Sequence, residues 1–307
     1  MSLPAGSTPP VTYSPYINPQ APYEAAWQTP GYLMVIGGAD RLDPESTIAR
    51  LFLRLVARVE ANSAQRGVVL VSTATRHPEI LTSEYIRIFS RLGLDRSQIH
   101  APLIRHRDEA HLHDRTEMLR NAAGIFITGG DQYLLTQVLD RTPAEEAMRD
   151  AYKRGAVVAG TSAGATAMGR PMIVAGGGTG EMRLGMVQMS RGLAWAGDDV
   201  IVDTHFGARG RFPRLAAAVA EHPRCLGVGV DENTCLLLDG QKNGLVVGSG
   251  VVYVVDPAGT VLNTVHGAHS GQTVSLAPLS VSVLAAGATY NIRTRTLQLA
   301  TAEPAQL

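Results

Sequence analysis

Scarce residue types already exclude several classes of protein for this chain of 307 residues. Only two cysteines occur, Cys225 and Cys235, which is too few for a disulfide framework, and we interpret both as reduced core residues. Neither sign of charge is in excess, because 27 basic residues balance 27 acidic ones, so no basic surplus is available to bind a phosphate backbone. This balance argues against nucleic acid as a partner.

Long apolar runs are missing as well. No stretch of about 18 apolar residues, the length that crosses a bilayer, occurs in the chain, and its first residues lack the basic stretch and apolar run of a secretory signal. We therefore expect a cytoplasmic protein that does not enter a membrane. Hydrophobic residues nevertheless make up 45% of the chain, enough for the core of a large α/β domain.

Regular structure is not expected in residues 1–30. They contain seven of the 17 prolines, and proline removes the backbone donor that helices and central strands need. We expect an N-terminal arm that is either disordered or ordered by packing on the domain or on a second subunit, with Tyr13, Tyr16, Tyr23 and Trp27 as contacts.

Beyond residue 30, buried strands alternate with amphipathic helices. Continuous apolar runs predict strands near residues 32–36, 67–72, 124–128 and 156–159. Apolar residues at helical spacing predict one helix over 48–59, with Ser46 as its N-cap, and another over 78–92. Strand–helix alternation is the signature of a parallel sheet.

This pattern predicts an α/β fold of three layers, in which helices flank a mostly parallel sheet. After about residue 225, short β-rich runs separated by turn residues predict an antiparallel or mixed extension of the same sheet. No linker or repeat divides residues 31–307, which we expect to form a single domain. Ligands bind such sheets at the carboxyl ends of the strands, so the chemistry should lie there.

The strongest motif lies at one of these strand ends, in the sequence Gly160-Thr161-Ser162-Ala163-Gly164. It fits the G-x-S-x-G nucleophile elbow, whose small residues allow a tight strand-to-helix turn that exposes the serine. The amide of Ala163, at the start of the next helix, is placed to donate to a developing oxyanion. A tight turn without chemistry is the alternative.

A nucleophilic serine needs a base. Among nine histidines His205 stands out, because it follows an apolar run and precedes Arg209, Arg211 and Arg214. Three neighbouring arginines repel one another unless anionic groups neutralise their charge, and a carboxylate on the substrate would do so. A solvated surface, or pairing with structural acids, is the alternative.

The base in turn needs an acid that orients it. Asp231 and Glu232 end an apolar run further along the chain, and either could reach His205. Asp203 is the runner-up, but in an extended segment its side chain would share the face of the histidine two residues later rather than meet the ring from behind. The order Ser, His, acid differs from that of the α/β-hydrolase fold and indicates another parallel-sheet hydrolase.

The strand that precedes the nucleophile's strand ends in two glycines followed by Asp131 and Gln132. Its amides should lie beside the elbow, where glycine allows close approach of the backbone to a substrate. We expect the amide near Asp131 to be the second oxyanion donor and Gln132 to contact the substrate. A helix N-terminus capped by Asp131 is compatible with both.

No metal or cofactor is expected. His111 and His113 form an i, i+2 pair in a polar stretch, which is typical of a loop or cap rather than of a metal site. The glycine-rich run at 176–180 lacks the spacing and the preceding strand of a dinucleotide site, and we interpret it as a mobile loop near the active site.

Together these motifs resemble the cyanophycinase family of serine peptidases. Five segments carry the resemblance, in the family's order: VIGGAD at 35–40, ITGGDQ at 127–132, GTSAGA at 160–165, DTHF and the three arginines at 203–215, and GVDENT at 229–234. They lie within residues 31 to about 290, nearly all of the expected domain.

The resemblance implies a fold like that of class I glutamine amidotransferases and aspartyl dipeptidase, a homodimer, and a triad of Ser162, His205 and Glu232. The family cleaves cyanophycin, a poly-aspartate backbone with arginine on each side-chain carboxyl, into β-aspartyl-arginine dipeptides. The arginines would hold the carboxylates of the substrate. The residues expected to bind substrate are Gln132, Asp203, Thr204, Arg209, Arg211 and Arg214.

One position departs from the family pattern, which commonly has glutamine where Thr204 stands. The resemblance predicts a serine peptidase that hydrolyses cyanophycin. An aspartyl or isoaspartyl dipeptidase, or another small-peptide hydrolase of the same fold, is the alternative. A non-catalytic peptide-binding homologue is a second alternative, but a binding module has no need of all three triad residues.

Overall fold

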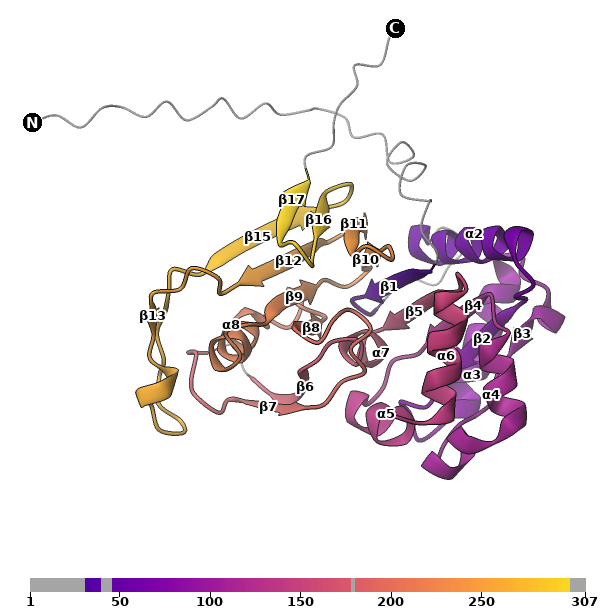
Figure 1. Cartoon of the computed structure of the whole chain (residues 1–307), viewed down its shortest axis with the longest axis horizontal. Coiled ribbons are helices and arrows are strands. Elements are labelled where there is room, and N and C mark those ends of the chain that lie inside the picture. Colours follow the sequence, from indigo (N-terminus) through magenta and orange to yellow (C-terminus); the bar gives the residue numbers. More distant parts are fainter. Residues whose placement is uncertain (1–30, 40–45, 178–179, 299–307) are drawn as a thin grey trace, which may run out of the picture.

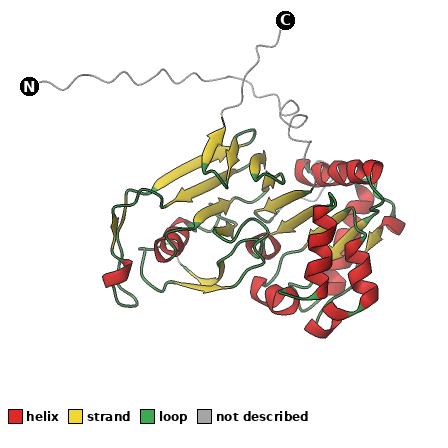
Figure 2. Cartoon of the chain, viewed as in Figure 1, coloured by secondary structure: helices red, strands yellow, loops and turns green. Residues whose placement is uncertain are grey.

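The computed structural model describes residues 31–39, 46–177 and 180–298, so the predicted N-terminal arm lies outside the described residues. Helices surround one part of the molecule, and strands dominate the other (Figure 1, Figure 2). In the described ranges, no helix is long and apolar enough to cross a membrane.

Within the described residues, nine strands form a mixed sheet in the order β17-β16-β11-β10-β1-β5-β4-β2-β3. One half is parallel and consists of β1 (Tyr32–Ile36), β5 (Val157–Thr161), β4 (Gly124–Ile127), β2 (Val68–Val71) and β3 (Ile99–His100). The other half is antiparallel and consists of β10 (Thr234–Leu238), β11 (Asn243–Gly248), β16 (Thr289–Asn291) and β17 (Thr296–Gln298). The four apolar runs predicted as strands are β1, β2, β4 and β5.

The helices lie on both faces of the parallel half. Alternate residues of β1 point in opposite directions, Leu33 and Val35 to one face and Met34 and Ile36 to the other. The Met34 face is covered by α2 (Thr47–Asn62) and α3 (Pro78–Arg91). The Leu33 face packs against α4 (His113–Arg120), α5 (Gln132–Leu139), α6 (Pro143–Lys153) and α7 (Ala163–Thr166).

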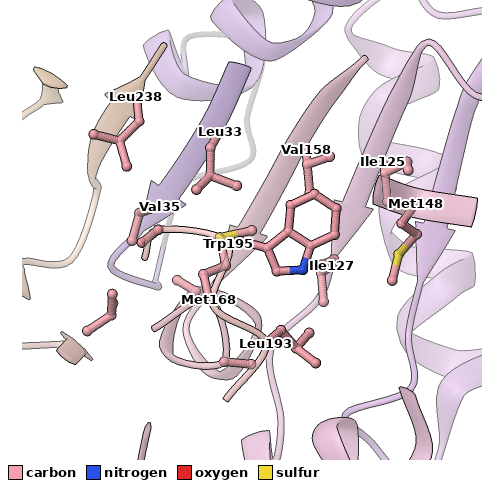
Figure 3. Packing of buried hydrophobic residues seen from close by; sticks show 14 of the residues in the cluster. Leu33, Val35, Ile125, Ile127, Met148, Val158, Met168, Leu193, Trp195 and Leu238 are labelled. Atoms are coloured by element: carbon pink, nitrogen blue, oxygen red, sulfur yellow. The ribbon is translucent and has the colours of Figure 1, made fainter. Parts of the chain in front are cut away.

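The three-layer prediction is therefore confirmed. Figure 3 shows the Leu33 face from close by, with Trp195 and Met168 packed near Val158 of β5. The cap of α2 is also as predicted, because the hydroxyl of Ser46 accepts a hydrogen bond from the amide of Ala49. Short 3-10 turns occur at Arg96–Gln98, Arg107–His111 and Val265–Gly267.

A second sheet, β15-β12-β9-β8, was not predicted. Its strands are β8 (Val200–Thr204), β9 (Leu226–Val230), β12 (Val251–Asp256) and β15 (Ser280–Ala285). β8 and β9 are parallel and are joined by α8 (Phe212–Glu221), whose Leu215 packs so closely on Gly227 that a Cβ there would lie 3.0 Å from Leu215 Cγ. Strands β8 and β9, connected by the crossover helix α8, form a separate parallel pair. The β-rich region is therefore divided between two sheets.

Two hairpins complete the structure. One pairs β6 (Met172–Gly176) with β7 (Val187–Ser190), and the other pairs β13 (Leu262–Asn263) with β14 (Leu276–Ala277). The loop of the first hairpin lies against residues 271–274 of the second, through backbone hydrogen bonds such as that from the Leu184 amide to the Gln272 carbonyl at 2.9 Å.

Candidate active site

Ser162 lies in a strained turn between β5 and α7, with φ of 52° and ψ of −114°. Such a conformation is costly for a residue with a side chain and is held only when its surroundings enforce it. Small neighbours are required, because a Cβ on Gly160 would lie 2.7 Å from the carbonyl of Gly164, and a Cβ on Gly164 would lie 2.5 Å from the carbonyl oxygen of Ile127. The turn leaves the side chain of Ser162 partly exposed at the carboxyl end of the parallel strands.

A chain of hydrogen bonds runs from Ser162 to an acid. Its hydroxyl lies 2.8 Å from Nε2 of His205, and Nδ1 of His205 lies 2.7 Å from Oε1 of Glu232. In the tautomer with hydrogen on Nδ1, His205 donates to Glu232 and Nε2 is free to accept the hydroxyl hydrogen of Ser162. The His205 side chain is 10% exposed, whereas that of Glu232 is 36% exposed. The structure thus brings together the three residues of the implied triad.

The other two acids considered from the sequence have different partners. Asp231 accepts hydrogen bonds from the amides of Gly207 at 2.8 Å and Val251 at 3.2 Å. Asp203 accepts hydrogen bonds from arginines. Of the candidates left open by the sequence, Glu232 is the one that contacts His205.

The end of β1 holds all three segments of the triad in register. Carbonyl oxygens of residues 36–38 accept, in order, the amides of Ser162 at 3.0 Å, His205 at 2.8 Å and Asn233, next to Glu232, at 3.0 Å. Three strand ends are therefore fixed to one turn by backbone hydrogen bonds.

Gly38 in this turn lies against the histidine ring. Its φ is 95°, and a Cβ there would lie 2.4 Å from Nε2 of His205. Gly37 is equally confined, because its Cβ would lie 1.9 Å from the carbonyl oxygen of Asp231. The sequence contained this signal as two glycines at the end of a buried strand, but it did not reveal that they touch the base.

The Asp131 amide is not available as an oxyanion donor, which corrects the expectation drawn from the sequence. It donates to the carbonyl of Ala74 at 2.7 Å. The Asp131 carboxylate accepts hydrogen bonds from the amides of Tyr133 at 2.8 Å and Leu134 at 3.2 Å, so that it caps α5, the alternative considered from the sequence.

Two other amides remain near Ser162. Gly129 is adjacent to the serine, since a Cβ on it would lie 3.3 Å from Ser162 Cβ, and the amide of Gly130 has no acceptor among the described residues. Ala163 begins α7, and its amide is likewise without an acceptor in the described part of the chain. These amides, without acceptors among the described residues, are donors of the kind that stabilises an oxyanion.

The three arginines differ in how they are engaged. Arg214 is buried and binds Asp203 through Nε at 2.6 Å and through Nη2. Arg211 donates to Asp203 at 3.1 Å and to the carbonyl of Thr204 at 2.6 Å, and burial lowers the pKa of its guanidinium. Arg209 is exposed, and within the described residues no hydrogen bond or ion pair engages its guanidinium.

A pocket of about 180 Å³ lies over these residues, lined by Gly177, Arg209, Gly210, Arg211 and Arg214. It adjoins the active site, because Arg211 binds the backbone of Thr204, the residue before His205. Arg209 therefore offers the least engaged positive charge of this pocket. Gly177 belongs to the glycine-rich run interpreted as a mobile loop; residues 178 and 179 of that run lie outside the described residues.

Three residues expected to bind substrate have partners inside the protein. Asp203 has no exposed surface, and Thr204 is 2% exposed with its hydroxyl 3.2 Å from that of Thr166. The side-chain amide of Gln132 donates to the carbonyls of β6. A side chain without exposed surface cannot line a pocket, which corrects the expectation for Asp203 and Thr204.

The histidine pair considered as a metal site is split between two elements. His111 ends a 3-10 turn and His113 begins α4. Across the described ranges, no group of three or more histidine, cysteine or acidic side chains could hold a metal ion.

Comparison with known proteins identifies curated relatives of similar length. Cyanophycinase of Trichormus variabilis is 36% identical over 269 residues, which is 86% of this chain and 87% of that protein. Cyanophycinase of Geminocystis herdmanii is 35% identical over 266 residues, 85% of this chain and 94% of that protein. Cyanophycinase of Synechococcus elongatus is 32% identical over 269 residues, 87% of this chain and 81% of that protein.

The fold also has a solved counterpart, a peptidase from an acI-B1 Actinobacterium. The two superpose with a TM-score of 0.62 at 20% identity, over 86% of this chain and 97% of that one, which is evidence about the fold alone. The model of Peptidase family S51 matches residues 33–246. With a family model that spans most of the chain and relatives above 30% identity over more than four fifths of it, this protein belongs to peptidase family S51.

Proposed function

We propose that Ser162, at a nucleophile elbow, is the nucleophile of a cyanophycin-degrading exopeptidase. The hydrogen-bonded chain from Ser162 through His205 to Glu232 carries this proposal. His205 takes the hydroxyl proton as Ser162 Oγ attacks the peptide carbonyl, and Glu232 stabilises the imidazolium that results.

The remaining steps use the same groups. The amides of Ala163 and Gly130 hold the oxyanion of the tetrahedral intermediate, His205 returns the proton to the leaving amine, and an acyl-enzyme forms on Ser162. Water, deprotonated by His205, then attacks the ester and releases the acid product with free serine. Each proton that His205 accepts is therefore returned.

Cyanophycin is proposed as the substrate because curated relatives that align over most of this chain are named cyanophycinase. The expected products are β-aspartyl-arginine dipeptides. A pocket beside the active site with an exposed, unengaged Arg209 suits a substrate that presents carboxylates. Arg211 and Arg214 contribute positive charge to its floor.

Product analysis by mass spectrometry tests this proposal. The wild type should release β-aspartyl-arginine from cyanophycin, Ser162→Ala should release none, and Ser83→Ala, on the exposed side of α3, should match the wild type. Release of the dipeptide by Ser162→Ala at the wild-type rate would overturn the assignment. Faster turnover of aspartyl or isoaspartyl dipeptides than of cyanophycin would indicate a dipeptidase, and no turnover of any peptide would indicate a binding homologue.

We also propose that the protein acts as a homodimer in the cytoplasm. The homodimer comes from the family resemblance, and the cytoplasmic location is the expectation drawn from the sequence. Light scattering coupled to gel filtration should give twice the chain mass of 32.6 kDa, and a monomer would contradict the first of them.

A further inference from the structure

The β6–β7 hairpin contains an irregularity next to the active site. Ile173 pairs with Met189 and Ala175 pairs with Gln188, so Val174 is an extra residue on β6, a β-bulge. A bulge takes backbone groups out of the ladder, and in a partly buried strand these groups need other partners.

Gln132 supplies those partners. Its side-chain nitrogen donates to the carbonyl oxygen of Ile173 at 2.9 Å and to that of Val174 at 3.1 Å, which uses both amide hydrogens. Gln132 is the first residue of α5 and follows Gly130 and Asp131 directly. The bulge is therefore bound to the turn that carries a proposed oxyanion donor.

Arg214 binds the end of the same strand. Its Nη1 donates to the carbonyl oxygen of Gly176 at 3.0 Å. The backbone of Gly177 lies on the arginine stem, since a Cβ on Gly177 would lie 2.5 Å from both Cβ and Cδ of Arg214. Asp203, completely buried, fixes the other side of the guanidinium two residues before His205.

We propose that Gln132 and Arg214 are positioning residues that hold β6 as a fixed wall of the substrate pocket, which β6 reaches through Gly177, the residue directly after it. Gln132 acts from the oxyanion turn, and Arg214 acts from α8, where Asp203 of β8 holds its guanidinium. The expected change in KM rests on the proposed function, whereas the contacts that hold β6 do not. The Ser162–His205–Glu232 hydrogen bonds do not involve β6, so loosening β6 should weaken peptide binding and leave the reactivity of the serine unchanged.

Hydrogen exchange measured by mass spectrometry tests the structural part without any substrate. In Gln132→Ala, amides in the peptide that covers residues 172–177 should exchange at least about five times faster than in the wild type, because the bulge loses its two donors. Gln137→Ala, an exposed glutamine on the same helix, should leave exchange unchanged. Arg214→Lys, which keeps the charge but cannot bridge Asp203 and Gly176 together, should also increase exchange.

Two further measurements test the kinetic part. For Gln132→Ala, KM for cyanophycin should rise at least about tenfold while kcat changes less than threefold. The rate of labelling by a small fluorophosphonate, which needs the triad but not the pocket wall, should stay within about twofold of the wild type.

The outcomes separate this proposal from the proposed function. Unchanged exchange in both Gln132→Ala and Arg214→Lys would show that these residues do not hold β6. If KM rose in spite of unchanged exchange, Gln132 would be a direct substrate contact. Faster exchange with unchanged KM would overturn the role of β6 as a pocket wall. If the wild type itself does not cleave cyanophycin, the proposed function fails. The exchange result still decides whether Gln132 and Arg214 hold β6.

Discussion

The two ends of the central strands differ in how their polar groups are hydrogen-bonded. At the carboxyl end, Ser162, His205 and Asn233 all have positive φ angles, of 52°, 50° and 52°, and backbone hydrogen bonds from the end of β1 hold their segments. At the amino end, the hydroxyl of Tyr152 and the indole nitrogen of Trp195 are buried without a hydrogen-bond partner in the described part of the chain. Positive φ angles therefore accompany all three segments of the candidate triad.

The amino end, in contrast, contains the strongly shifted ionisable groups. Lys242 donates to the carbonyl of Trp195 at 2.7 Å, and burial, together with the charges of Arg293 and Arg149, lowers its pKa to about 8. Burial raises the pKa of Tyr152 to about 12. In this protein the largest pKa shifts therefore mark structural burial rather than the candidate active site.

The largest expected effect comes from Gly38→Ala. The new Cβ would collide with the ring of His205, so kcat should fall about 10,000-fold, close to the loss of the base itself. Gly93→Ala is the matched control, because Gly93 has a φ of 98° but nothing within 4 Å of its Cβ position. Equal activity of the two variants would show that Gly38 does not position the base.

Glu232→Gln should have the next largest effect. A neutral amide in place of the carboxylate no longer stabilises the imidazolium, so kcat should fall about 1,000-fold with little change in KM. Glu84→Gln, on the exposed side of α3, should leave both parameters unchanged. Steady-state kinetics with cyanophycin measure both, and a loss below about threefold for Glu232→Gln would exclude Glu232 as the orienting acid.

Arg209→Ala sharpens the distinction among the arginines. Removing the unengaged charge from the pocket should raise KM about tenfold and leave stability unchanged, because within the described residues this guanidinium has no partner to lose. Arg54→Ala, an exposed arginine on α2, removes the same charge far from the pocket and should have no effect. An unchanged KM for Arg209→Ala would show that this charge does not hold the substrate.

The last prediction concerns the amino end, where the expected effect is on stability and not on activity. Because the pKa of Lys242 is about 8 in the folded protein and about 10.4 when unfolded, the unfolded chain binds more protons between these values. The free energy of unfolding of the wild type should therefore rise between pH 8 and pH 10, by up to about 3 kcal/mol relative to Lys242→Met. Urea unfolding at several pH values measures this, and parallel curves for the two proteins would contradict it.

Much of the fold could be predicted because it depends on local pattern. Apolar runs such as Tyr32–Ile36 can be buried only as central strands, and Ser46 followed by apolar residues at helical spacing could only begin a helix like α2. The partners of the later strands could not be predicted. The apolar run of β9 does not determine its partners, so its pairing with β8 and β12, rather than with the central sheet, could not be predicted.

For the candidate site, the sequence identified the groups better than their partners. The elbow motif and the resemblance predicted Ser162, His205 and Glu232 as a triad, and these residues lie in one hydrogen-bonded chain. The partner of Asp203 depends on α8 bringing Arg214 back onto β8, which is a tertiary contact without a sequence signature. The sequence therefore predicted that polar residues beside the motif face the substrate. Asp203 is instead buried and binds Arg214.

Covalent labelling of the nucleophile tests the central claim most directly. After reaction with a fluorophosphonate, peptide mapping by mass spectrometry should find one adduct, on Ser162, in the wild type. The adduct should be absent in His205→Ala and strongly reduced in Gly38→Ala, with Gly93→Ala labelled like the wild type. An adduct on another residue, or labelling of Ser162 at the wild-type rate in His205→Ala, would contradict the triad.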